Sequence, residues 1–283
     1  MGAGRRQRAA TRSEGRDMEE WLRARGWQSM THLAWRRWRV LTRKPGSLVR
    51  CLNYTVRIND GPNFYVLYKD IFFNRIYHFE AERPEPLILD CGSNIGMSIL
   101  YFKHVYPKAR IIALEPDPTI FPYLHENVFR NGLTDVRLLQ VAAGGREGPV
   151  TLYSDGKFGS CLADHLPGDI AAGWTMHQVP CVRLRDYLSE TVDFLKMNIE
   201  GAEYETLVDA RDYLRQVREM VVEYHHLPKL PRTLHEILTL LHKQGFEYCV
   251  SDFNLETYDG ARSPVRLDAN TRYYRHIYAR RID

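Results

Sequence analysis

Residues 86–102 read PLILDCGSNIGMSILYF, and this stretch sets the class of fold. The apolar residues 87–89 are typical of a buried strand, whereas the spacing of apolar residues in 94–106 is typical of a helix. Asp90 closes the strand, and Gly92 and Gly96 permit the tight turn between strand and helix. A strand, a glycine-rich turn and a helix in this order predict a ligand cradle at the carboxyl end of the strand.

The same alternation of apolar runs and helical segments continues along the chain. It predicts an α/β fold with a mainly parallel sheet that is covered on both faces. No helical segment separates the last two strands, so we expect the final strand to insert antiparallel. The predicted strands lie at 87–92, 110–117, 136–144, 192–201, 219–226, 246–253 and 273–281, and the predicted helices at 94–106, 119–132, 202–216 and 232–245. Between 150 and 188 the pattern is less regular.

The first 86 residues differ from this alternating body, which we place at 87–283. Residues 1–16 are small, basic and without periodicity, which is typical of a disordered tail. We expect residues 17–86 to form an extension that covers the body. Its expected elements are a helix from Met18 to about Leu41, a hairpin of strands 53–58 and 63–68 with a turn at 60–62, and a helical or irregular cover at 69–86.

Positive charge and tryptophan are concentrated at the start of the chain. Residues 1–50 hold 13 Lys and Arg against 4 Asp and Glu, together with four of the five tryptophans. Such a segment can lie on an anionic membrane surface, clamp an acidic acceptor or nucleic acid, or cover the body with its arginines solvated. The rest of the chain is acidic, which argues against a nucleic-acid partner. Peripheral membrane contact through this segment is therefore an expectation.

Composition argues against several other classes of protein. No apolar run approaches the roughly 20 residues of a membrane span, and the N-terminus lacks the apolar core of a secretory signal. The five cysteines are scattered without a CxxC pair, which argues against a disulfide framework or a zinc site. We expect a cytoplasmic protein, at most at the inner surface of a membrane, with no resident metal.

A second acid indicates what the cradle binds. Glu115 closes the second strand, where a carboxylate can accept hydrogen bonds from both hydroxyls of a ribose. Asp90 and Glu115 together therefore indicate a nucleoside-containing cofactor. A dinucleotide requires G-x-G-x-x-G, but Asn94 stands where the middle glycine belongs. S-adenosylmethionine has a ribose and no phosphate, and Asp90 could hold its ammonium group through water. The plainer interpretation is that the glycines only shape a turn and Asp90 caps the helix.

Four motifs follow one another in the chain, at 90–96 (DCGSNIG), 113–118 (ALEPDP), 141–145 (VAAGG) and 194–203 (FLKMNIEGAE). Over about residues 87–253 they resemble the FkbM-type methyltransferases, which use S-adenosylmethionine. Members carry D-x-G-A-N-x-G, E-P and K-I-D-x-E-G-A-E. The resemblance implies a Rossmann-like class I methyltransferase fold with a seven-stranded sheet and an antiparallel last strand. It also implies these cofactor contacts: Asp90, Gly92, Ser93, Asn94, Gly96, Glu115, Pro116 and Ala142.

Two positions depart from the family pattern. Ser93 replaces the alanine of the first motif, a change that is harmless in size. Asn198 replaces the aspartate of K-I-D, so an amide stands where the family has a carboxylate. This difference argues against a metal-binding or acid–base role at position 198.

The acceptor side of the site is expected at the ends of the fourth and fifth strands. Methyl transfer to a hydroxyl needs alignment and removal of a proton. The candidate catalytic residues are Asn198, Glu200, His225 and His226. Lys196 lies inside its strand, where we expect it to pair with an acid. Glu200 and Glu203 have an alternative role, because acids are favourable at the start of a helix, and the histidines have one in packing.

These observations predict a methyltransferase that uses S-adenosylmethionine. The resemblance implies O-methylation of a hydroxyl on a sugar, glycan, glycolipid or natural product, so the expected partner is a small-molecule or glycan acceptor. Two alternatives remain at this point: an oxidoreductase linked to NAD or a nucleotide sugar, and a non-catalytic module that only binds the cofactor.

Overall fold

The computed structural model describes residues 40–157, 159–162, 173–227, 230–251 and 273–282. Its main sheet has seven strands in the order β12-β13-β11-β10-β3-β4-β5. The strands are β3 (Leu87–Cys91), β4 (Arg110–Leu114), β5 (Val136–Leu139), β10 (Val192–Met197), β11 (Val217–His226), β12 (Phe246–Val250) and β13 (Tyr273–Arg281). All neighbours pair in parallel except β13, which is antiparallel to both β11 and β12. The α/β class and the antiparallel insertion of the last strand are thus confirmed.

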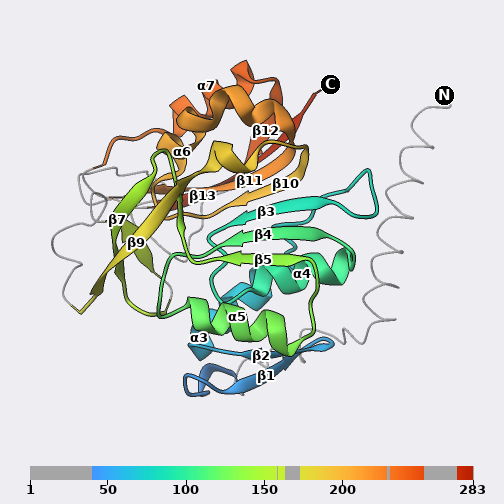
Figure 1. The fold of residues 1–283 in the computed structure, drawn as a ribbon, viewed down its shortest axis with the longest axis vertical. Helices are drawn as coiled ribbons and strands as arrows, with labels where there is room; N and C mark the ends of the chain where they lie inside the picture. Colours follow the sequence, from blue (N-terminus) through green and yellow to red (C-terminus); the bar gives the residue numbers. More distant parts are fainter. Residues whose placement is uncertain (1–39, 158, 163–172, 228–229, 252–272, 283) are drawn as a thin grey trace, which may run out of the picture.

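Helices cover both faces of this sheet (Figure 1). Helices α4 (Met97–Val105) and α5 (Phe121–Arg130) lie on one face, and α6 (Glu203–Ala210) and α7 (Leu234–Lys243) lie on the other. Alternate residues of β3 belong to the two cores, since Ile88 packs with the α4 and α5 side while Leu87 and Leu89 pack with the α6 and α7 side. A strand that is buried on both faces must be apolar throughout, which explains the continuous run in the sequence.

The predicted strand at 136–144 is wrong in its second half. Strand β5 ends at Leu139, and β6 (Ala142–Gly144) belongs to a second sheet in the order β6-β9-β7-β8. The other strands are β7 (Gly148–Ser154), β8 (Ser160–Leu162) and β9 (Thr175–Arg183). Gly144 packs directly on Cys181 of β9, because an added Cβ would lie 2.6 Å from its Sγ atom. This second sheet lies beyond the carboxyl ends of β4 and β5 (Figure 1).

The extension contains a hairpin, but not where we predicted it. The hairpin pairs β1 (Leu48–Cys51) with β2 (Tyr54–Arg57), so only the expected strand at 53–58 is confirmed. Residues 63–68 form helix α3 (Gly61–Leu67) and the start of a π-helix (Tyr68–Phe73) instead of a strand. Asp60 accepts a hydrogen bond from the Asn63 amide at 2.9 Å and Pro62 follows it, so the apparent turn residues are the start signal of a helix.

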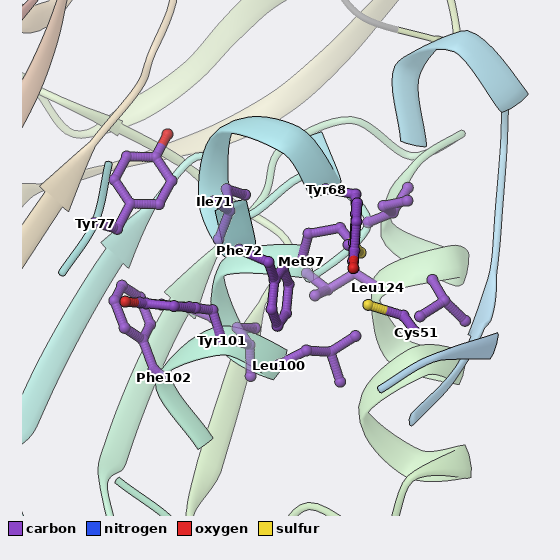
Figure 2. Packing of buried hydrophobic residues seen from close by; sticks show 14 of the residues in the cluster. Cys51, Tyr68, Ile71, Phe72, Tyr77, Met97, Leu100, Tyr101, Phe102 and Leu124 are labelled. Carbon is purple, nitrogen blue, oxygen red and sulfur yellow. The ribbon is translucent and has the colours of Figure 1, made fainter. Parts of the chain in front are cut away.

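The described part of the extension shares its core with the main sheet. Figure 2 shows Tyr68, Ile71 and Phe72 directed toward α4, and the rings of Phe72 and Tyr101 meet edge to face at 5.4 Å. Further along, Phe79 stacks on Phe194 of β10 at 4.4 Å. The described part of the extension therefore packs as part of the same folded unit as the main sheet.

Side-chain amides at the C-terminal end of α5 pair with the free edge of β2. Asn131 Oδ1 accepts from the Thr55 amide at 2.8 Å, and Asn127 Oδ1 accepts from the Arg57 amide at 2.6 Å. The same two side chains donate back to the carbonyls of Thr55 and Arg57. These contacts satisfy backbone groups that an unpaired strand edge would leave to solvent.

The predicted basic tail and nearly all of the predicted helix at 18–41 lie outside the described residues. The expected membrane contact of this segment stays a prediction for the same reason. Among the helices that the structure describes, none has the length and apolar character needed to cross a membrane.

Candidate active site

A cavity of about 570 Å³ lies at the carboxyl ends of β3, β4, β10 and β11. Its walls include the extension, the glycine-rich turn after β3, the segments that follow β4 and β10, the second sheet, and the paired strands β11 and β13. The predicted cofactor cradle and the predicted acceptor side open into this one space. A bound cofactor and an acceptor would therefore share it.

The glycine-rich turn packs directly on the end of β10. Gly92 has φ of +85°, and an added Cβ would lie 1.8 Å from the backbone oxygen of Asn198. The amides of Gly92 and Ser93 both donate to the carbonyl of Leu114, at 2.9 and 3.0 Å. Only glycine fits at position 92, so the sequence requirement for the cradle has a steric cause.

Glu115 is buried in the wall of the cradle. Its Oε2 atom accepts from the Asn94 amide at 2.8 Å, and Oε1 accepts from the Asp117 amide at 3.0 Å. Burial raises the pKa of this carboxyl to about 7, against the opposing effect of the two backbone donors. A carboxylate offers about four acceptor positions, and these two bonds leave acceptor capacity on both oxygens. This arrangement fits two ribose hydroxyls.

Asn94 supports this geometry through its own backbone. It has φ of +48°, a left-handed conformation that asparagine tolerates better than most residues. Its side-chain oxygen accepts from the Ile95 amide at 2.8 Å. The residue that stands in place of a middle glycine therefore aims an amide at Glu115.

Asp90 lies behind the cavity wall, although we expected it to reach the cofactor. Its carboxylate is fully buried, accepts from Ser98 Oγ at 2.5 Å, and has Lys196 Nζ 3.1 Å from its Oδ1 atom. Lys196 also donates to the carbonyl of Gly92 and itself lines the cavity. The expected pairing of Lys196 with an acid is confirmed, and Asp90 supports the cradle through this lysine.

The other predicted cofactor residues divide into two groups. Gly96 begins α4 with φ of +90°, where an added Cβ would lie 2.9 Å from Leu124, so it brings α4 and α5 together. The predicted residues that do line the cavity are Gly92, Ser93, Asn94, Glu115, Pro116 and Ala142. The cradle thus has a buried acid with free acceptor capacity and a turn in which Gly92 presents no side chain, and this combination fits an adenosyl cofactor.

The structure brings all four predicted catalytic residues into the cavity wall: Asn198, Glu200, His225 and His226. The Asn198 amide hydrogen-bonds the Tyr77 hydroxyl, while its Oδ1 atom is buried without a hydrogen-bond partner among the described residues. Glu200 has φ of +54°, a strained conformation that is concentrated at functional sites.

His225 is surrounded by three carboxylates. Its Nδ1 atom lies 3.1 Å from Glu203, and its Nε2 atom lies 3.5 Å from Glu200 and 3.3 Å from Glu223. Burial lowers the pKa of His225, but the three carboxylates outweigh it and raise the pKa well above its ordinary value. His225 is therefore an imidazolium that donates from both nitrogens.

His226, the next residue, has a different environment. It is buried against the Tyr273 ring at 5.1 Å, and its Nδ1 atom has no hydrogen-bond partner among the described residues. Burial, assisted by Arg232, lowers its pKa. His226 is thus a neutral imidazole with a buried polar atom.

Sequence reasoning missed two members of this site, Glu223 and His276. Both line the cavity, and His276 Nε2 lies 2.9 Å from Glu223 Oε2. A signal for Glu223 was present, since one acid interrupts the apolar run VVEY two residues before His225, on the same face of the strand. The described part of the chain contains no group of three His, Cys, Asp or Glu side chains arranged to hold a metal ion.

Comparison with known proteins agrees with this geometry. Residues 90–248 match the model of the methyltransferase FkbM domain, which is more than half of the chain. The chain belongs to this family. S-adenosylmethionine is accordingly its methyl donor, and the alternative of a dinucleotide-linked oxidoreductase is set aside.

Three relatives of this FkbM methyltransferase are informative. Methyltransferase sdnD of Sordaria araneosa is 32% identical over 56% of this chain and 73% of its own length. The 2-O-methyltransferase NoeI of Sinorhizobium fredii is 29% identical over 50% of this chain and 65% of its own length. The 31-O-demethyl-FK506 methyltransferase FkbM of Streptomyces tacrolimicus is 29% identical over 64% of this chain and 80% of its own length.

Proposed function

We propose that this chain methylates a hydroxyl oxygen of an uncharged small-molecule or glycan acceptor. The observation that carries the proposal is the cluster of carboxylates and imidazoles in the wall of the same cavity as the cofactor cradle. A hydroxyl loses its proton when its oxygen is methylated, so an O-methyltransferase needs a proton acceptor beside the acceptor oxygen. Glu200, Glu223, His225 and His276 are the polar groups of this cluster.

The names of two relatives support oxygen as the methylated atom. NoeI is named as a 2-O-methyltransferase, and FkbM as an enzyme that acts on 31-O-demethyl-FK506. Both names describe methylation at oxygen. The shared chemistry supports O-methylation here, and the acceptor is argued from the walls of the cavity.

The walls favour an acceptor that is neutral and partly apolar. Asp70, Glu200 and Glu223 place carboxylates around the acceptor side, and like charges disfavour a carboxylate or phosphate on the ligand. The extension, in contrast, contributes an apolar surface to the cavity through Val66 and Leu67. Hydroxyl groups can donate to the acids while a ring or chain packs on the apolar residues. A sugar, glycolipid or polyketide-type natural product has this combination.

Asn198 suits a contact with the acceptor. Its Oδ1 atom has no hydrogen-bond partner within the described parts of the chain, and a hydrogen bond donated by the acceptor would remove the cost of leaving this buried polar atom unsatisfied. The aspartate that the family pattern has at this position would add a further negative charge to an already acidic wall. The amide keeps the hydrogen-bonding capacity without that charge.

The test is turnover with S-adenosylmethionine on paired acceptors. Neutral glycosides and polyols are each paired with the uronate or phosphate of the same skeleton, and products are analysed by mass spectrometry and NMR. We expect O-methylation of a neutral member, with kcat/KM at least about tenfold above its anionic partner. Asp70→Asn should narrow this difference in kcat/KM, whereas Asp212→Asn on the exposed surface should not.

Exclusive methylation at nitrogen, or preference for the anionic members, contradicts the proposal. No turnover on any acceptor, with the cofactor bound, favours a non-catalytic module.

A further inference from the structure

The carboxylate of Glu223 lies between two imidazoles. Its Oε2 atom is 2.9 Å from Nε2 of His276, and its Oε1 atom is 3.3 Å from Nε2 of His225. Glu223 and His276 are direct partners in the antiparallel register of β11 and β13, so the sheet itself holds the pair together. Burial tends to raise the pKa of Glu223, but the two imidazoles hold it below its ordinary value. At neutral pH the group is therefore a carboxylate, with one imidazole on each oxygen.

The two imidazoles differ in what their second nitrogen contacts. The second nitrogen of His225, Nδ1, donates a hydrogen bond to Glu203, so both of its nitrogens carry protons and neither has a lone pair for another proton. Among the described residues, the hydrogen bond and ion pair of the His276 ring both go through Nε2. Because the carboxylate requires a proton on Nε2, neutral His276 keeps its lone pair on Nδ1.

His276 is held firmly and lies in the wall of the cavity. Its amide donates to Ser251 Oγ at 3.1 Å, and its carbonyl accepts from the Ser251 amide at 2.9 Å. Its ring lies 5.9 Å from the Tyr274 ring and 6.0 Å from the Tyr278 ring. Its side chain is 13% exposed, which gives a ligand in the cavity access to the ring. Among the described residues, the charged and titratable groups in contact with its ring are Glu223, Tyr274 and Tyr278.

The geometry points to His276 as the residue that takes the proton from the acceptor hydroxyl, with Glu223 as its positioning residue. This inference rests on the proposed O-methylation and names its catalytic base. The donor supplies the methyl group, and its carbon–sulfur bond breaks with the electron pair left on sulfur. The acceptor oxygen forms the new bond to carbon while its proton passes to Nδ1 of His276. The resulting imidazolium faces the carboxylate of Glu223, which stabilises it.

His225 has a different role in this arrangement. As an imidazolium it fixes the position of Glu223 from the side opposite to His276. Glu200 and Glu203 in turn hold His225 in position. The contacts therefore run from these two acids through His225 and Glu223 to His276. Glu200, His225 and His226 were the candidate bases we expected from the sequence, and this arrangement makes Glu200 and His225 positioning residues.

The first test reads the tautomer directly and needs no acceptor. The full chain is labelled with ¹⁵N-histidine, bound to S-adenosylhomocysteine and studied by ¹⁵N NMR across a range of pH. The histidine signals are assigned by comparison with the single variants. At high pH neutral His276 should carry its proton on Nε2 only, whereas His225 should stay doubly protonated through neutral pH. In Glu223→Gln the Nε2 preference of His276 should weaken. A neutral His276 with its proton on Nδ1, or a His225 that is neutral at pH 7, overturns the inference.

The second test uses the acceptor identified by the paired turnover assay. His276→Gln should lower kcat by a factor of about 10²–10⁴, with KM and the affinity for S-adenosylhomocysteine within about threefold of the parent. The acid limb of its kcat–pH profile, measured at saturating S-adenosylmethionine, should disappear. Glu223→Gln should lower kcat and move the acid limb to lower pH, because the imidazolium loses its carboxylate. His235→Gln, on the exposed face of α7, is the matched control and should change nothing.

The outcomes separate the inference from the proposed function. Full kcat in His276→Gln with an unchanged acid limb overturns the role of His276 while O-methylation stands. Methylation at nitrogen alone overturns the proposed function, and the role of His276 in it falls at the same time. A loss of cofactor affinity as large as the loss of kcat in His276→Gln also contradicts the inference, because it indicates a structural role.

Discussion

Nζ of Lys196 lies 3.1 Å from Oδ1 of Asp90, and both side chains are buried, Asp90 behind the cofactor cradle and Lys196 at the wall of the cavity. The same ammonium group donates to the carbonyl of Gly92, so the pair connects β3, β10 and the glycine-rich turn. Breaking one partner of a buried ion pair leaves an uncompensated charge in a poorly solvated place. The pair therefore links the stability of the sheet to the shape of the cradle.

We expect Lys196→Met to lower the free energy of unfolding by about 3–5 kcal/mol, measured by denaturant titration. The double variant with Asp90→Asn should recover part of this loss, because it removes the stranded carboxylate. The control is Lys108→Met, which breaks an exposed pair with Glu85 and should cost less than about 1 kcal/mol. Equal losses in Lys196→Met and Lys108→Met would show that the buried pair has no special role.

Cofactor binding should depend on the ionisation of Glu115. Its pKa is about 7 in the ligand-free protein because of burial, and hydrogen bonds from ribose hydroxyls favour the charged form. Affinity for S-adenosylhomocysteine should therefore rise about tenfold between pH 6 and pH 8, with release of a proton. Calorimetry in buffers of different ionisation enthalpy measures both quantities.

The controls for this prediction follow from the same carboxylate. Glu115→Gln should weaken binding by about 1–3 kcal/mol and remove the pH dependence, whereas Glu147→Gln on the exposed surface should do neither. The folded protein holds the Glu115 proton more tightly than the unfolded chain does. The contribution of protonated Glu115 to the free energy of unfolding should thus be present at low pH and be lost as pH rises from about 4.5 to about 7. An affinity that is flat from pH 6 to 8 would argue against a ribose contact.

Gly92→Ala should destabilise the protein far more than alanine at another glycine of similar backbone. The new methyl would lie 1.8 Å from a backbone oxygen, and the residue would keep a left-handed conformation. The conformation costs about 1–2 kcal/mol, and the clash adds about 1–3 kcal/mol. Gly132→Ala is the matched control, because Gly132 has φ of +60° and an added Cβ would meet no described atom within 4 Å apart from its chain neighbours, so this variant should show only the first cost. Urea unfolding of both variants checks this, and equal losses would contradict the steric argument.

The cradle could be predicted from the sequence because its parts are local in the chain. Asp90, Gly92 and Glu115 each lie at or just beyond the end of an apolar run, and parallel strands bring those ends to one edge. Even there, the sequence did not show that Asp90 would be enclosed. Its partner Lys196 comes from a strand more than a hundred residues away, and burial depends on that packing.

The acceptor side was predicted only in part, for a physical reason. His276 reaches Glu223 across 53 residues, and the contact exists because of the register between β11 and β13. A predicted strand does not define its register. The misplaced hairpin has a different cause, because Asp60, Gly61 and Pro62 are typical of both a turn and the start of a helix.

The extension, which lies outside the family match at 90–248, should determine acceptor size. Val66 and Leu67 at the end of α3 are half-buried in the cavity wall. Leu67→Trp adds an aromatic ring to this wall, so KM for a large acceptor should rise about tenfold or more while affinity for S-adenosylhomocysteine stays within about twofold. A clash between the added ring and the acceptor that costs about 1.4 kcal/mol corresponds to such a factor. Phe73→Trp, at an exposed position of the adjoining π-helix, is the control and should leave both constants unchanged. If Leu67→Trp lowers cofactor affinity as much as acceptor affinity, the prediction is wrong. In that case α3 lies against the cofactor, and the acceptor binds in another part of the cavity.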